Sequence, residues 1–161
     1  REDRTGDAPA LSSFDDPRLP ALRIGVQLVG NDLAATPPGY ALARHGALRR
    51  VSGFTLNGEG PPALRMVRAV ADGALDAAVV WGPQAGYFAA QAGTPLRMSP
   101  ASAPADMGMP FAFSIAMGVR KGDTAMQQRL DDFLRRRAAD IDAILDAYFV
   151  PRIAAAAGDR P

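Results

Sequence analysis

The sequence predicts an α/β fold in which helices cover both faces of a mostly parallel sheet. Short apolar runs of strand length alternate with segments of helical periodicity, and Gly and Pro residues separate the two kinds of segment. Strands that alternate with helices of roughly 10 to 15 residues are typical of βαβ units, whose crossovers place helices on both faces of a sheet. A chain of 161 residues is long enough for one hydrophobic core. We therefore expect a single three-layer αβα lobe.

Three apolar runs predict the main strands of this sheet. Residues 22–29 (LRIGVQLV) form a run with β-branched members, residues 51–56 alternate between apolar and polar, and residues 75–81 (LDAAVVW) end in the only Trp of the chain. We expect two further strands, a short one at residues 96–99 and a longer one at residues 111–119.

The expected helices carry recognisable start and stop signals. A proline in the first helical turn sacrifices an amide that has no partner there, and a glycine ends a helix readily. These signals are Thr36-Pro37-Pro38 with Gly46, Pro61-Pro62 with Gly73, and Pro83 with Gly93. The Thr36 hydroxyl is expected to cap the first of these helices. Asp123 or Thr124 caps a last helix, in which Thr124 and Gln127 fit a capping box and which Pro151 stops.

The domain organisation follows from these elements. We expect a linker or crossover at residues 1–11, the α/β lobe at 12–123, a C-terminal helix at 124–153 that packs on the lobe or returns from it, and a tail at 154–161.

Composition excludes several classes of function. The 18 Lys and Arg residues against 17 Asp and Glu leave no bulk charge that would favour nucleic acid, and the three arginines at 135–137 are expected to form a solvated helix face. No apolar run approaches the ~20 residues of a membrane span. With no Cys, disulfides, thiolate catalysis and the common zinc sites are all excluded.

Two loops are the candidate binding site. Ligands of parallel α/β sheets bind beyond the carboxyl ends of the strands. The first such loop contains Gly30, Asn31 and Asp32, whose backbone amides suit an anion or a carbonyl, although an ordinary βα turn explains the same residues. The second begins at Trp81, which offers either a flat apolar wall to a ligand or a core side chain. Gly82, Pro83 and Gln84 follow it.

No catalytic set accompanies these loops. His45 is the only His, and the sequence shows neither a metal-ligand cluster nor a nucleophile, base and orienting group for it to join. We therefore predict a binding module, with no enzymatic activity, no metal and no cofactor.

Three segments in order resemble a known family. Residues 16–19 (DPRL), 22–27 (LRIGVQ) and 73–88 (GALDAAVVWGPQAGYF) are similar to the second lobe of amino-acid-type periplasmic solute-binding proteins, family 3. Within that superfamily, residues 36–38, 80–83 and 115–123 (IAMGVRKGD) resemble the MoxJ/XoxJ group, whose members are encoded with quinoprotein methanol dehydrogenases. The resemblance covers residues 12–153 and implies one lobe of the periplasmic-binding-protein-like II fold and a location in the periplasm.

Two departures from the family pattern bear on the ligand. Amino-acid receptors of this type usually carry Gly-Thr-Thr where this chain has Gly30, Asn31 and Asp32, and usually carry an Asp where this chain has Trp81. Without either charge partner, a free amino acid is a poor ligand. The resemblance then implies an apolar or quinone-like ligand, or a protein partner.

Several functions remain open on this basis. The resemblance implies either an accessory factor that activates a methanol dehydrogenase dependent on pyrroloquinoline quinone or a transporter's receptor for a small ligand. The effector domain of a transcription regulator shares the fold by analogy, and an enzyme of this fold is the remaining alternative. The family's first lobe is expected to be absent, which would expose an apolar half-cleft near Trp81 and Phe111 and favour self-association.

Overall fold

Three parallel strands form the sheet. The computed structural model describes residues 10–29, 34–108 and 111–153. Strand β1 (Ile24–Val29) lies in the centre, with β3 (Val51–Phe54) on one side and β4 (Ala77–Val79) on the other, so that Ile24 pairs with both Val51 and Ala77. The short β2 (Ala34–Ala35) pairs antiparallel with the end of β1. The three expected main strands are confirmed, each shorter than the run that predicted it.

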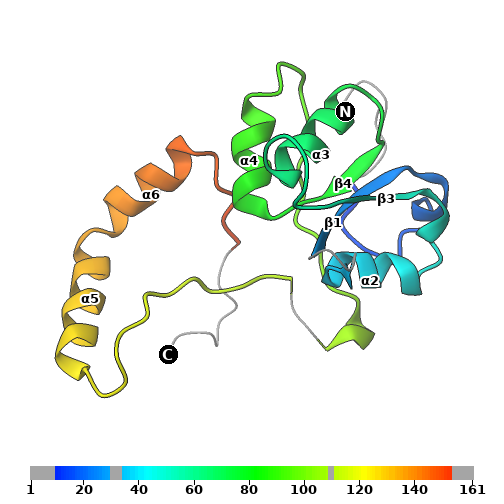
Figure 1. Ribbon diagram of the computed structural model, residues 1–161. Coiled ribbons are helices and arrows are strands. Elements are labelled where there is room, and N and C mark those ends of the chain that lie inside the picture. The colour runs from blue at the N-terminus through cyan, green and yellow to red at the C-terminus, as the bar shows by residue number, and fades with distance from the viewer. Residues whose placement is uncertain (1–9, 30–33, 109–110, 154–161) are drawn as a thin grey trace.

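Helices cover both faces of this sheet. Helix α2 (Pro37–Arg44) follows β1 on one face, whereas α3 (Pro62–Ala71) and α4 (Gly82–Ala90) pack together on the other (Figure 1). Short 3-10 turns span Leu19–Ala21, Leu48–Arg50 and Ala105–Met107. The α/β, three-layer lobe with a mostly parallel sheet is therefore confirmed.

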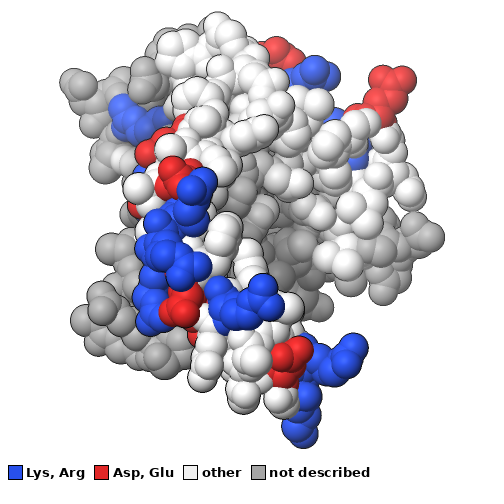
Figure 2. Space-filling view, turned by 90° about the vertical axis from the view of Figure 1, so that its left-hand side faces the viewer, with Lys and Arg blue, Asp and Glu red and all other residues white. Residues whose placement is uncertain are grey.

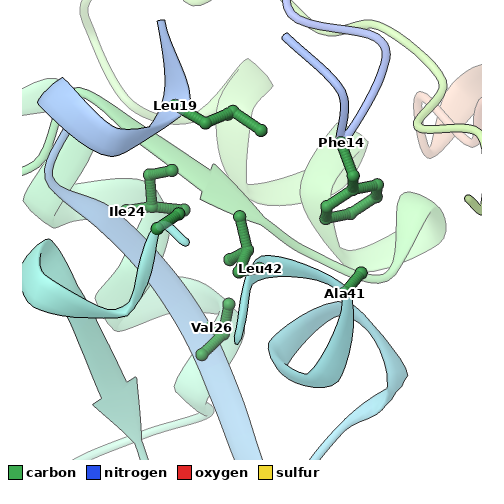
Figure 3. Close-up of a cluster of buried hydrophobic side chains, with 7 residues drawn as sticks. Phe14, Leu19, Ile24, Val26, Ala41 and Leu42 are labelled. Carbon is green, nitrogen blue, oxygen red and sulfur yellow. The ribbon is translucent and has the colours of Figure 1, made fainter. Parts of the chain in front are cut away.

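The core has one half on each face of the sheet. On the α2 face, Leu42 and Ala41 pack with the β1 side chains of Ile24 and Val26 and with Phe14 (Figure 3). The buried residues of the α3 side are Ala63, Met66, Val67, Ala71 and Leu75. Alternation along β1 explains the division, because successive strand side chains point to opposite faces.

Arg23 and Asp76 tie β1 to β4 at the ends where both strands begin. The Asp76 carboxylate accepts hydrogen bonds from the Arg23 backbone amide and guanidinium, at 2.7 to 3.0 Å, and the same guanidinium donates to the Gly73 carbonyl. The backbone amides of Asp76 and Ala77 in turn donate to the Arg23 carbonyl. This two-way contact fixes the register of the β1 and β4 pairing.

Some helix ends differ in detail from the expectation. Gly46 and Gly73 follow α2 and α3 with φ of +73° and +77°, which only glycine adopts at little cost. Thr36 precedes α2, but its hydroxyl donates to the Gln27 carbonyl at 2.9 Å and caps no amide.

The helix that begins at Thr124 is capped by Asp123, because the Asp123 carboxylate accepts a hydrogen bond from the Met126 amide at 3.0 Å. The capping box of Thr124 and Gln127 is therefore wrong.

Two predicted strands are absent from the described residues. Residues 96–99 and 111–119 have no regular secondary structure there. The second segment keeps its alternating pattern, and its apolar side chains at positions 113, 115, 117 and 119 are exposed. A strand needs a neighbour to accept its backbone hydrogen bonds, and no backbone bond involving residues 111–119 is found among the described residues.

The C-terminal helix divides in two. Helix α5 (Thr124–Arg136) ends at Arg137, which also precedes α6 (Ala138–Ala147), so the expected continuous helix is wrong. Residues 112–147, here called the arm, extend away from the lobe (Figure 1). Lys and Arg side chains gather on its outward face (Figure 2). The arginines at 135–137 are exposed, as expected. Within the described chain, no helix has the length and apolarity needed to cross a bilayer.

Asp16 gives the lobe a pH-dependent contact. The guanidinium and the backbone amide of Arg18 donate to its carboxylate and lower the pKa of Asp16 from 3.8 to about 2. A depressed carboxylate pKa adds stability that is fully present above the unfolded value of 3.8 and is lost as the pH falls through about 2.

Replacing Asp16 removes this contribution. We expect the stability difference between the native chain and Asp16→Asn to be constant near neutral pH and to vanish as the pH falls through about 2. Urea unfolding at a series of pH values measures it, with Asp131→Asn on the exposed arm as the control. A difference that persists unchanged at the lowest pH would contradict this assignment.

Candidate functional site

The strand order creates a topological switch point at the carboxyl ends of β1 and β4. These strands are parallel neighbours, and the chain leaves β1 toward α2 on one face but leaves β4 toward α4 on the other. At such a switch point the two connections diverge, and ligands of parallel α/β sheets generally bind there. The second of the two loops chosen from the sequence begins here, between β4 and α4.

Trp81 lies at this switch point and is not a core residue. It is the residue before α4, its side chain is 45% exposed, and its ring lies 6.0 Å from that of Phe113 at an angle of 45°. The two rings form an apolar corner in which the indole N–H supplies the only donor of either side chain. This exposure agrees with the ligand-wall interpretation of Trp81.

Gly82, Pro83 and Gln84 form the first turn of α4. Gly82 and Pro83 are half-buried and Gln84 is exposed. Pro83 and Gln84 line an apolar hollow of about 340 Å³ between α4 and α6, together with Tyr87 and Tyr148. The structure therefore brings these two residues toward the C-terminal helix, and only Gly82 adjoins Trp81 directly.

The first loop lies beyond what the structure describes. Gly30, Asn31 and Asp32 fall outside the described residues, and their role stays a prediction. Both flanks are fixed at the end of β1, since Val29 belongs to that strand and the Thr36 hydroxyl bonds to the Gln27 carbonyl. The described residues on either side of it, Val29 and Ala34, pair with each other at the carboxyl end of β1.

Sequence reasoning missed some residues of this region. Phe113 lies beside Trp81, whereas Phe111, which we expected at the exposed surface, is half-buried and packs edge-on against Phe14 at 5.4 Å. Pro151 lies against Gly82. The alternation at residues 111–119 was a signal for Phe113, but no local pattern pointed to Pro151, because it reaches α4 from 69 positions further along the chain.

The chemistry of the described site is apolar. Trp81, Gly82, Pro83, Gln84 and Phe113 carry no charge. Across residues 10–29, 34–108 and 111–153, no group of three metal-ligating side chains is found. His45 lies at the end of α2, as expected, with its Nδ1 3.2 Å from the Asp15 carboxylate, a partner that sequence reasoning did not foresee. Such a site suits an apolar surface or a planar ligand more than a free amino acid.

The fold is similar to one lobe of a periplasmic binding protein. The structure matches the crystal structure of the periplasmic binding protein XoxJ from Methylobacterium extorquens AM1, with a TM-score of 0.73 and 31% identity over 92% of this chain. In sequence, 91 residues are 38% identical to protein MoxJ of Methylorubrum extorquens strain AM1, which is 54% of this chain. No protein-family model matches.

Both comparisons confirm the resemblance to the MoxJ/XoxJ group. The matched regions amount to 30% of MoxJ and 65% of the XoxJ chain, so this chain spans less than two thirds of either relative.

Proposed function

We propose that this chain is the second lobe of a periplasmic binding protein that acts as an accessory or activation factor for a quinoprotein methanol dehydrogenase. The observation that carries the proposal is the uncharged corner of Trp81 and Phe113 at the switch point of the sheet. Half-exposed aromatic side chains are frequent anchors of protein interfaces. The similarity to MoxJ and XoxJ supports the choice of system and the periplasmic location.

The arm supports a two-lobed architecture for the whole protein. Residues 112–119 carry alternating apolar side chains with no strand beside them, and α5 and α6 have no buried residues. An apolar face of this kind needs a partner. We assign residues 12–123 to the lobe, with residues 112–123 leading out of it, and residues 124–153 to a helical segment that returns toward a first lobe. Residues 1–11 would then be the crossover and 154–161 a tail.

A receptor for a small ligand is the second candidate. Periplasmic binding proteins of this fold close on small molecules, and the corner of Trp81 and Phe113 would suit a planar, quinone-like compound delivered to a transporter. The two candidates share the site and differ in what occupies it.

Titration of Trp81, the only Trp of this 161-residue chain, tests both proposals. Its emission is measured in the two-lobed protein, with any Trp of the first lobe replaced by Phe, against pyrroloquinoline quinone and, separately, against the purified dehydrogenase. A saturable change with the dehydrogenase alone supports the accessory role, and one with the quinone alone establishes the receptor. No change with either, at concentrations far above micromolar, would sink both.

Trp81→Ala tests the assignment of the anchor. We expect binding to weaken by at least ~30-fold, the effect of losing about 2 kcal/mol at an interface hot spot. Calorimetry measures it, because the variant has lost the Trp whose emission reports on binding. The matched control is Leu48→Ala, which is 60% exposed and lies in the turn before β3. Equal affinity in the two variants would show that Trp81 is not a contact.

A further inference from the structure

The chain after α6 turns sharply and returns to the lobe. Helix α6 ends in a Schellman motif, in which the Phe149 amide donates to the Asp146 carbonyl and the Val150 amide to the Leu145 carbonyl. Phe149 has φ +56°, and among the described residues it is the only non-glycine with a positive φ. Glycine usually occupies this position, so a bulky residue there indicates that the surrounding contacts hold the turn in place.

This turn packs against two glycines of α4. Gly82 and Gly86 are four residues apart and lie on one face of the helix. A Cβ atom at Gly86 would overlap the carbonyl oxygen of Phe149, and one at Gly82 would lie 3.0 Å from Cγ of Pro151. The contact therefore requires glycine at position 86.

Side-chain contacts at both ends of residues 148–152 hold this segment in place. The rings of Tyr87 and Tyr148 stack with centroids 5.9 Å apart and 24° between their planes. Beyond the turn, Arg152 pairs with Asp142 and Asp146, both on α6. Residues 148–152, here called the strap, are thus bound to α4 on one side and to α6 on the other.

The strap and the start of the arm meet the same corner of the lobe. Phe113, near the start of the arm, lies against Trp81, and Pro151, beyond its end, lies against Gly82. Trp81 and Gly82 are adjacent, so both ends of the arm are held at the beginning of α4. A displacement of either residue would disturb both attachments.

We infer that the strap is a conformational latch that seats the arm on α4 and covers the Gly82 side of the candidate site. The inference rests on the proposed function for the role of the Trp81 corner. When the strap is packed on α4, a ligand or partner cannot reach Gly82, because Pro151 occupies that surface. Release of the strap therefore frees both the arm and this part of the site.

Spin-label distances on the full chain test the latch without any ligand. The chain has no Cys, so Arg68→Cys on α3 and Gln128→Cys on α5 place one label on the lobe and one on the arm, at exposed positions. We expect one narrow distribution of the distance between the two labels when the chain is otherwise native. Adding Gly86→Ala, which expels the strap, should abolish the narrow peak.

A matched glycine variant is the control. Gly118→Ala changes an arm glycine whose added Cβ would meet nothing within 4 Å, and it should keep the narrow peak. If Gly86→Ala does not fold, Pro151→Ser and Arg152→Ala weaken the strap without altering α4, and both should broaden the distribution and shift the emission of Trp81.

The outcome separates the latch from the proposed function. A narrow peak that survives in Gly86→Ala, or in both strap variants, overturns the latch, whatever the protein binds. A released arm together with no response to dehydrogenase or quinone would support the latch and reject the proposed function.

Discussion

Leu42→Ala is expected to destabilise the lobe by about 2–5 kcal/mol, the range for truncating a fully buried leucine. Leu42 lies on α2 with 0% exposure and packs in the cluster that contains Phe14, Ile24 and Val26. The loss combines the transfer of the removed carbons with the cavity left behind. Since small domains are stable by only about 5–15 kcal/mol, it would remove a large share of the total.

Urea unfolding measures this loss. The midpoint should fall while the slope with denaturant stays unchanged, because the surface exposed on unfolding is nearly the same. Leu48→Ala, with the same change of side chain at a 60% exposed position, should lie within about 0.5 kcal/mol of the native chain. Equal effects of the two variants would show that Leu42 is not at the centre of the core.

Ile115→Asp is expected to destabilise the two-lobed protein but not this 161-residue chain. Ile115 is 82% exposed, so a carboxylate there should change the stability of the 161-residue chain by less than about 0.5 kcal/mol. If a first lobe packs on the arm, the same carboxylate is buried without a partner, and a cost of about 3–5 kcal/mol is expected.

Thermal unfolding of both forms tests this difference. Leu56→Asp serves as the control, since Leu56 is 60% exposed and lies on the lobe, outside the arm. We expect it to be nearly neutral in both forms. If Ile115→Asp is equally neutral in the two-lobed protein, the arm does not pack on a first lobe through this face.

The elements that carry their own signals were predictable from sequence. The runs containing β1, β3 and β4 and the proline starts of α2, α3 and α4 all gave correct elements. Periodicity and turn chemistry act within a few residues, so a single sequence expresses them directly. The position of Trp81 beyond the carboxyl end of a parallel strand also followed, because the end of an apolar run marks the end of its strand.

The failures have a different cause. Residues 111–119 have the alternation of a strand, but alternation reports only which side chains seek burial and does not identify the neighbouring strand. The pairing of Pro151 with Gly82, and of Phe113 with Trp81, depends on where the chain returns in space. For Gly30, Asn31 and Asp32, the sequence remains the only basis for the assignment.

The placement of the core has a consequence for the order of folding. Every buried Ala, Val, Leu, Ile, Met or aromatic side chain among the described residues lies between Phe14 and Leu75. The central strand β1 acquires its second neighbour once β4, ending at Val79, is available. The lobe can therefore complete its core without the arm, and the residues of the strap then dock on an already folded α4.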